Sequence, residues 1–254
     1  MVLKWNITIP ELAGTEERRA YIYLPTTYYD QPEKRYPVLY MFDGHNLFFD
    51  EDATYGKSWG LKEYMDITDT PLIIAAVECN HGANNERLQE YSPYTFDDPQ
   101  LGHIQGKGRL TMKWLIHTFK KEVDKKFRTL PDRAHTYIGG SSMGGLMSLF
   151  GVLRYNHVFS KAAALSPSIW FAPNKLMNMI TKGRVRPDTV IYMDYGQNEM
   201  SYRKAMPKMY SKTVATLLNR NILLTSRIVP KGTHSEASWE KQIPYFMETL
   251  LYEE

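Results

Sequence analysis

Short runs of apolar, β-branched and aromatic residues recur along the chain, and turn-forming residues separate them. Several of these runs are apolar at successive positions, which is typical of strands covered on both faces of a sheet. The expected strands are Trp5–Ile9, Ala20–Leu24, Pro37–Phe42, Leu72–Glu78, Thr136–Gly139, Ala162–Leu165, Val190–Met193 and Ile222–Val229.

Helical patterns alternate with the later strands. The expected helices are Leu110–Phe127, Leu146–Tyr155, Tyr202–Leu218 with a kink at Pro207, and Trp239–Leu251. Strand–helix alternation favours a mostly parallel sheet with helices on both faces. The first two strands have no helix pattern between them, so we expect an antiparallel hairpin at one edge. With no linker or repeat in the sequence, the pattern predicts a single α/β domain over residues 1–254, with about eight strands.

A long segment, Asn80–Gly108, has little periodicity and is rich in Asn, Gly, Tyr and Asp. It follows an expected central strand, so we place it at the carboxyl edge of the sheet, where open α/β folds bind ligands. A loop of this length in a compact domain is typically functional or mobile.

Composition excludes several classes of protein. The 43% hydrophobic and 23% charged residues are those of a globular protein, and the net charge of +3 gives no strong field for nucleic acid. Cys79 is the single cysteine, so the chain can form no internal disulfide. The N-terminal residues lack a signal-peptide pattern, and the longest apolar run, Leu72–Val77, is too short to span a membrane. We therefore expect a cytoplasmic protein with no membrane or nucleic-acid partner.

The stretch Gly140-Ser141-Ser142-Met143-Gly144 is the strongest chemical motif. A G-x-S-x-G pentapeptide between a strand and a helix is the pattern of a nucleophile elbow, in which a tight turn exposes one serine hydroxyl. Glycines two residues before and two residues after it single out Ser142 as the nucleophile. The pentapeptide alone recurs by chance in roughly one chain in ten of this length, so its partners decide its meaning.

A serine nucleophile needs a base and an acid, which follow it in the order acid, then histidine. Only His157 and His234 lie beyond Ser142. His157 comes just after the elbow helix and is expected to face away from the site, whereas His234 follows the last strand. The acid should follow the preceding strand, where Glu199 and the alternative Asp194 are available; Glu199 is favoured because it lies on the following turn.

An oxyanion hole requires two backbone N–H donors. One is expected from Met143, which follows the nucleophile at a helix N-terminus. The other is expected from His45, in the turn Asp43-Gly44-His45 after the third strand, where Gly44 allows close approach to a ligand.

With these motifs assembled, the chain resembles the putative-esterase family of α/β-hydrolases, the group of esterase D and enterochelin-esterase-like enzymes. The resemblance runs from about Tyr21 to the end. It rests on the stretches 37–48, Arg87 with Glu90-Tyr91-Ser92-Pro93, Gly139–Leu146, Phe159 with Ser166–Trp170, Gly196–Glu199, and His234 with Trp239.

The resemblance implies hydrolysis of a small-molecule ester without metal or cofactor, and it implies Glu199 as the acid. Where relatives have a His-Gly oxyanion turn, this chain has Asp43-Gly44, which leaves the backbone donor in place. Trp170 either lines a substrate pocket or packs as a structural aromatic residue. Arg87 and Glu90 either contact substrate or form ion pairs that brace the long loop.

The same acyl-enzyme also allows acyl transfer, and a non-catalytic binding protein on this fold is a further alternative. Neither the ester nor the oligomeric state can be read from the sequence.

Overall fold

The computed structural model describes residues 1–99 and 101–252. The chain forms two compact units, the first from Met1 to Tyr137 and the second from Ile138 onward. We describe each unit by itself, and the single domain expected from the sequence stays a prediction.

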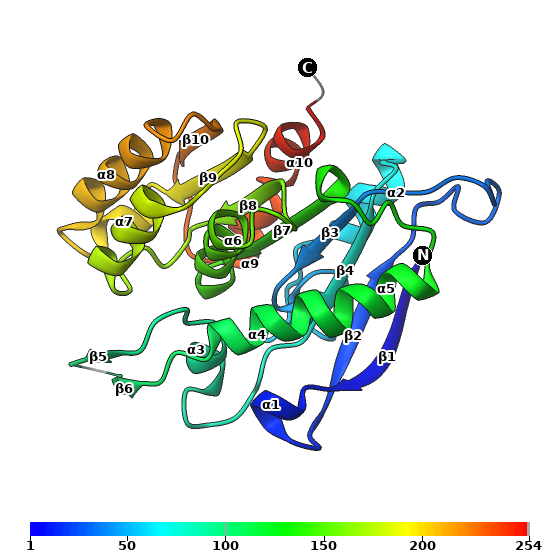
Figure 1. Ribbon diagram of the computed structural model, residues 1–254, viewed down its shortest axis with the longest axis horizontal. Coiled ribbons are helices and arrows are strands. Elements are labelled where there is room, and N and C mark those ends of the chain that lie inside the picture. The colour runs from blue at the N-terminus through cyan, green and yellow to red at the C-terminus, as the bar shows by residue number, and fades with distance from the viewer. Residues whose placement is uncertain (100, 253–254) are drawn as a thin grey trace. The chain divides into compact units, whose positions relative to one another are not determined.

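Four strands form the sheet of the first unit, in the order β1-β2-β4-β3. They are β1 (Val2–Thr8), β2 (Glu17–Tyr23), β3 (Val38–Met41) and β4 (Ile73–Val77). The first two pair antiparallel, which confirms the expected edge hairpin, although the one-turn helix α1 (Pro10–Ala13) joins them. β3 and β4 pair in parallel and are buried throughout, as their uninterrupted apolar runs predict (Figure 1).

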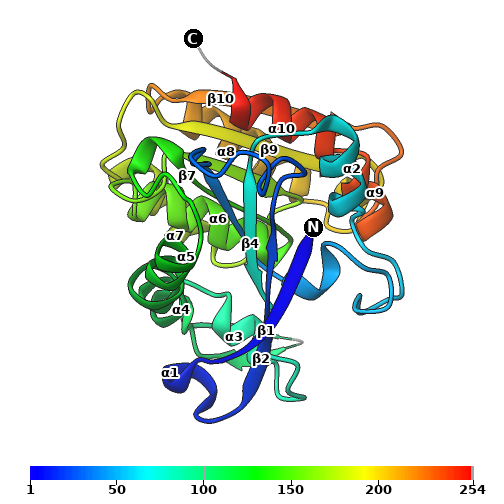
Figure 2. The ribbon, with the colours of Figure 1, turned by 90° about the vertical axis from the view of Figure 1, so that its right-hand side faces the viewer.

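Helices cover both faces of this sheet. Helix α4 (Gly108–Trp114), the π-helical turn η2 (Leu115–Phe119) and α5 (Lys120–Lys126) follow one another without a break where one helix is predicted. Phe119 contacts Trp5 of β1 and Tyr40 of β3 on one face, with ring centroids 6.2 Å apart in both pairs. Helix α2 (Leu61–Thr68) lies on the opposite face (Figure 2). Its Asp66 accepts a hydrogen bond from the Tyr23 hydroxyl.

The segment 80–108 has more structure than its sequence predicts. It contains helix α3 (Glu86–Glu90) and an antiparallel pair of short strands, β5 (Phe96–Asp98) and β6 (Gly102–Ile104). Periodicity could not reveal elements of three to five residues, because they are shorter than the window in which a period shows. The single-turn helices η1 (Gly44–Asn46) and η3 (Arg133–His135) complete this unit, and β7 (Thr136–Ser141) begins at its end.

The second unit continues with β7 and has the strand order β7-β8-β9-β10. The remaining strands are β8 (Lys161–Leu165), β9 (Val190–Gly196) and β10 (Leu223–Val229), and neighbouring pairs among these three are parallel. The eight strands of the predicted sheet thus divide four and four between the units in the described part of the chain.

Helices flank both faces of this second group of strands. Helices α6 (Met143–Arg154), α7 (Pro173–Lys182) and α8 (Met206–Leu218) lie on one side, and α10 (Ile243–Leu251) packs on β8 and β9 from the other (Figure 1). Two details differ from prediction. Pro207 begins α8 rather than kinking it, because its missing N–H is harmless in a first turn. The expected last helix is split into α9 (Glu236–Glu240) and α10.

None of the helices in residues 1–99 and 101–252 has both the length and the apolar character needed to cross a membrane.

Candidate active site

Ser142 lies between β7 and α6 in a strained backbone conformation. Its φ of 57° and ψ of −121° lie outside the regions that a residue with a β-carbon normally adopts. Three backbone hydrogen bonds of 3.0 Å hold it there: its own N–H donates to the Leu165 carbonyl, and its carbonyl accepts from Leu146 and Ser168. The turn therefore presents the Ser142 side chain ahead of the first turn of α6.

The glycines around Ser142 permit a very close approach of backbone segments. A β-carbon on Gly140 would lie 3.0 Å from the carbonyl carbon of Gly144, and one on Gly145 would lie 2.9 Å from the Leu165 carbonyl oxygen. Gly145, just outside the pentapeptide, therefore has as little room for a side chain as Gly140 within it.

The structure brings His234 and Glu199 together. Nδ1 of His234 lies 2.7 Å from Oε2 of Glu199. Glu199 is buried in the turn η4 (Asn198–Ser201) after β9, and His234 follows β10, with 38% of its side chain exposed. Since β9 and β10 are parallel neighbours, with Val229 opposite Gly196, their following loops emerge at the same edge.

Asp194 lies inside β9 and faces other partners. Its carboxylate accepts hydrogen bonds from the Ser166 N–H at 3.0 Å and from the Tyr192 hydroxyl at 2.8 Å. Burial raises the pKa of Asp194 to about 7, although these two hydrogen bonds oppose the shift. Between the two acids left open by the sequence, the geometry places Glu199 on the histidine.

Two further residues, Ser166 and Trp239, hold Glu199 in place. The Ser166 hydroxyl donates to Oε1 of Glu199 at 2.7 Å, and the indole N–H of Trp239 donates to the same hydroxyl at 3.1 Å. Oε1 also accepts the Gly196 N–H at 3.0 Å. Sequence reasoning gave neither Ser166 nor Trp239 a role; the only signal was their presence in the stretches that resemble the esterase family.

Ser142 and His234, both among the described residues, form no hydrogen bond with each other. Serine–histidine hydrogen bonds are often long in enzymes without substrate and tighten when substrate binds. Because Glu199 occupies Nδ1 of His234, Nε2 is the ring nitrogen that remains for a serine hydroxyl.

The two expected oxyanion donors lie in different units. Met143 is the first residue of α6, so its N–H has no partner within the helix. His45 lies in η1 of the first unit, and its buried ring is held through Nε2 by the Thr54 hydroxyl at 3.0 Å. Burial lowers the pKa of His45, which keeps this ring neutral.

Arg87 and Glu90 are both in ion pairs, but with different partners. Arg87 makes a bidentate pair with the buried Asp43 at 2.7 and 2.8 Å, and Glu90 pairs with the buried Arg18 at 2.6 Å. These pairs tie α3 to the strands and to the turn after β3, as expected of a bracing role.

Trp170 packs in the second unit. Its ring lies edge-to-face on Phe171, with centroids 4.6 Å apart, and the Arg203 guanidinium lies 3.8 Å from its centroid. Both contacts fit a packed aromatic residue that one charged side chain covers.

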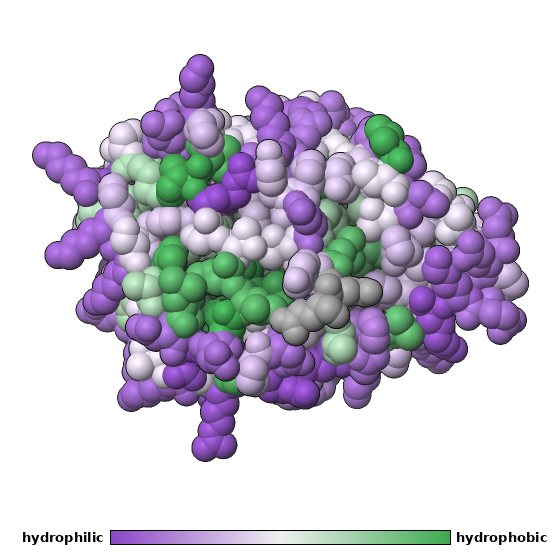
Figure 3. All heavy atoms as spheres, turned by 90° about the horizontal axis from the view of Figure 1, so that it is seen from above, coloured by the Kyte–Doolittle hydropathy of each residue, from purple (hydrophilic) through white to green (hydrophobic). Residues whose placement is uncertain are grey.

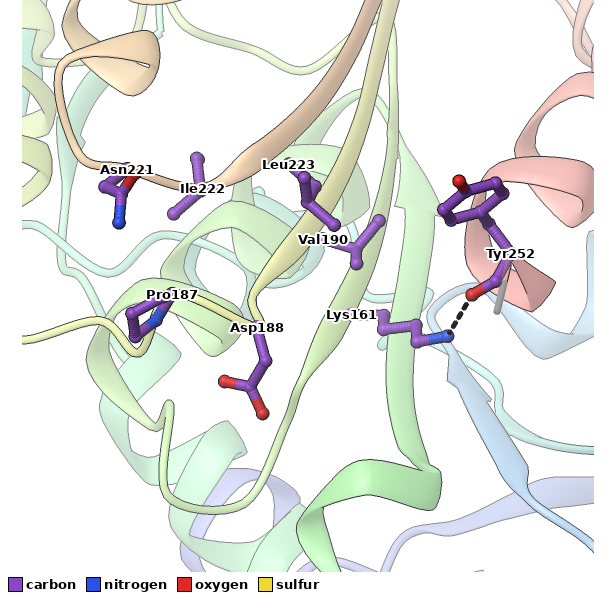
Figure 4. Close-up of a pocket in the computed structure, with 8 residues that line it drawn as sticks. All are labelled: Lys161, Pro187, Asp188, Val190, Asn221, Ile222, Leu223 and Tyr252. Carbon is purple, nitrogen blue, oxygen red and sulfur yellow. Dashed lines mark hydrogen bonds between the residues drawn. The ribbon is translucent and has the colours of Figure 1, made fainter. Parts of the chain in front are cut away.

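A separate cavity of about 490 Å³ lies at the opposite edge of the second unit's sheet. Lys161, Val190 and Leu223, the first residues of β8, β9 and β10, line it together with Asp188 and Tyr252 (Figure 4). Figure 3 shows hydrophobic side chains gathered in patches on one face of the molecule. Ser142, Glu199 and His234 all follow strand ends, so this cavity holds none of the predicted site residues.

Comparisons with known proteins agree with this architecture. The family described as Putative esterase matches residues 13–251. The Uncharacterized protein YbbA of Bacillus subtilis (strain 168) is 23% identical over 201 residues, which are 77% of this chain and 75% of that protein.

Two solved structures share the fold. An IroE-like serine hydrolase from Shewanella oneidensis gives a TM-score of 0.73 at 19% identity, covering 98% of this chain and 79% of the other. The siderophore hydrolase EstA from Aspergillus nidulans gives 0.71 at 16% identity, covering 99% and 95%. The α/β-hydrolase fold expected from the sequence is confirmed.

The fold and the family match define the class of protein: the chain belongs to the Putative esterase family of α/β-hydrolases. It is an esterase, an enzyme that hydrolyses carboxylic esters.

Proposed function

We propose that this esterase works through an acyl-enzyme on Ser142, with His234 as the general base and Glu199 as the acid that orients it. The observation that carries the proposal is the 2.7 Å contact between Nδ1 of His234 and Oε2 of Glu199. A carboxylate on Nδ1 fixes the tautomer in which Nε2 has a lone pair, and that lone pair can take a serine proton.

In the first half of the reaction, Ser142 Oγ attacks the ester carbonyl carbon while its proton moves to Nε2 of His234. Glu199 stabilises the imidazolium that forms. The Met143 N–H, at the positive end of α6, stabilises the negative oxygen of the tetrahedral intermediate. His45 N–H is the second donor in this proposal.

When the intermediate collapses, the protonated His234 gives its proton to the departing alcohol, and the acyl group remains on Ser142. Water then attacks the acyl-enzyme with His234 again as base, which releases the acid and restores the serine. The strained backbone of Ser142 supports this role, because strain of this kind is concentrated at functional turns.

We propose small-molecule esters as substrates and no metal or cofactor in this chemistry. The structurally similar EstA from Aspergillus nidulans is a siderophore hydrolase. A substrate panel should therefore include aromatic and siderophore esters.

The test is p-nitrophenyl acetate hydrolysis by purified Ser142→Ala. Loss of the nucleophile is expected to lower turnover on the order of a millionfold, while Ser141→Ala, the matched control next in sequence, keeps most of its activity. Retained hydrolysis by Ser142→Ala, or collapse of activity in Ser141→Ala alone, would overturn the assignment.

A further inference from the structure

The loops after β3 and β4 bring three metal-binding side chains together in the first unit. β3 and β4 are parallel neighbours with Met41 opposite Ala76, so the segments that follow them leave the same edge of the sheet. His45 lies four residues beyond Met41, and Cys79 and His81 lie three and five residues beyond Ala76.

One ligand atom from each of His45, Cys79 and His81 lies within 4.8 Å of the others. The two imidazole rings meet edge to face, with centroids 4.7 Å apart. A tetrahedral zinc ion holds nitrogen and sulfur ligands roughly 3.5 Å apart, so the three need to close by about 1 Å. His81 is exposed and lies outside helix and strand, and it can make that movement.

An unsatisfied nitrogen marks this cluster as more than a chance grouping. His45 is 97% buried and its Nδ1 has no hydrogen-bond partner, whereas its Nε2 is held by the Thr54 hydroxyl at 3.0 Å. A buried polar atom without a partner destabilises the folded chain, and a ligand at that atom would remove this cost. A hydrogen-bonded second nitrogen is also the usual setting of a metal-bound histidine, because it fixes the ring and leaves the other nitrogen to bind.

An ion pair lies beside the cluster in sequence. Asp43, two residues before His45, makes a bidentate ion pair with Arg87. Glu78, the residue before Cys79, accepts hydrogen bonds from the backbone N–H and the guanidinium of Arg19. When a divalent ion binds, the Cys79 proton leaves to solvent, and a sulfur–metal bond replaces the sulfur–hydrogen bond.

We propose that His45, Cys79 and His81 form a binding site for a zinc-like transition-metal ion. One thiolate and two imidazoles are ligands that zinc and similar ions prefer, and three protein ligands leave a fourth position open. Nothing in the ester hydrolysis requires this ion. Its place beside the turn that carries the His45 N–H makes it a regulatory site, and this consequence rests on the proposed function.

The binding test uses Co²⁺, which reports its ligands by absorption. Titration of the chelator-treated protein should give one tetrahedral Co²⁺ per chain, with a thiolate-to-cobalt charge-transfer band that Zn²⁺ removes. Cys79→Ser should abolish this band. His81→Ala should weaken Zn²⁺ binding on the order of 100-fold or more, since even second-layer residues of metal sites cost 10–100-fold.

The control is His135→Ala, because His135 is a partly exposed histidine of the same unit that pairs with Asp132 instead. It should bind Co²⁺ as the unmodified protein does. Thermal unfolding of each variant in the absence of metal shows that it is folded. Absence of the charge-transfer band, or its persistence in folded Cys79→Ser, would overturn the site.

The regulatory consequence is tested separately with p-nitrophenyl acetate. Saturating Zn²⁺ should slow the unmodified enzyme by about tenfold or more, because an oxyanion donor contributes 10²–10³-fold to turnover, and it should leave His81→Ala unaffected. Binding without inhibition supports the metal site and overturns the regulation. If Ser142→Ala keeps full activity while Co²⁺ still binds, the proposed function fails and the metal site stands.

Discussion

Glu199→Gln is the substitution that most directly tests the proposed site, because it changes one atom and leaves the side chain's shape intact. Oε1 of Glu199 accepts two hydrogen bonds, from the Ser166 hydroxyl and the Gly196 N–H, and Oε2 meets Nδ1 of His234. A glutamine has one oxygen and one NH₂ group, so it can accept hydrogen bonds at the Oε1 position or at the Oε2 position, but not at both.

The two buried donors hold the glutamine oxygen at the Oε1 position and leave its NH₂ group facing Nδ1 of His234. Nδ1 must then accept a hydrogen bond, which places the ring proton on Nε2. A histidine in this tautomer cannot take the proton of Ser142. The corresponding change in a serine protease, an Asp to Asn substitution, lowers turnover by about 10,000-fold. We expect the same scale here, or roughly 5.5 kcal/mol of lost transition-state stabilisation.

The assay is steady-state hydrolysis of p-nitrophenyl acetate, with thermal unfolding to show that Glu199→Gln stays folded. The matched control is Asp194→Asn, which makes the same change in the neighbouring buried carboxylate and should stay within about tenfold of the parent. A folded Glu199→Gln enzyme within tenfold of the parent, paired with an inactive Asp194→Asn, would refute the reasoning and make Asp194 the acid.

Three further changes test how the structure supports the site. Burial raises the pKa of Asp194 to about 7, so between about pH 4 and 7 the folded chain holds a proton that the unfolded chain has lost. Stability therefore falls as pH rises through this window, and Asp194→Asn should remove up to about 4 kcal/mol of this fall in urea unfolding titrations. Arg87→Ala removes the ion-pair partner of the buried Asp43 carboxylate, and we expect it to lower the free energy of unfolding by about 3–5 kcal/mol in the same titrations. An unchanged stability with a raised KM would instead assign Arg87 to substrate binding. Ser166→Ala removes the hydroxyl that links the indole N–H of Trp239 to Oε1 of Glu199. We expect a loss of about 1–3 kcal/mol in stability and a lower kcat at unchanged KM. An unaltered kcat would show that this hydroxyl does not position the site.

Much of the fold could be predicted from local sequence because its strands are buried on both faces. The uninterrupted apolar runs of β3 and β4 are typical of strands covered on both faces, and the predicted bounds lie within two residues of the observed ones at either end. The elements that escaped prediction are short: α3, β5 and β6 have too few residues to show a period. Their positions are set by pairs such as Arg87 with Asp43, which join residues 44 positions apart in the chain.

The same division holds at the candidate active site. Sequence order and spacing were enough to nominate Ser142 and His234, because a G-x-S-x-G turn and a histidine after the last strand occupy defined places in this fold. They did not decide which carboxylate is the acid, since Asp194 and Glu199 are five residues apart and both come after the same expected strand. In the tertiary structure Asp194 lies inside β9 and bonds to Tyr192, whereas Glu199 bonds to His234. The direction of a side chain in a strand is fixed by the strand, but a residue in the following turn can reach the neighbouring loop. Only packing between distant segments could also bring Ser166 and Trp239 to Glu199, and His45 to Cys79 and His81.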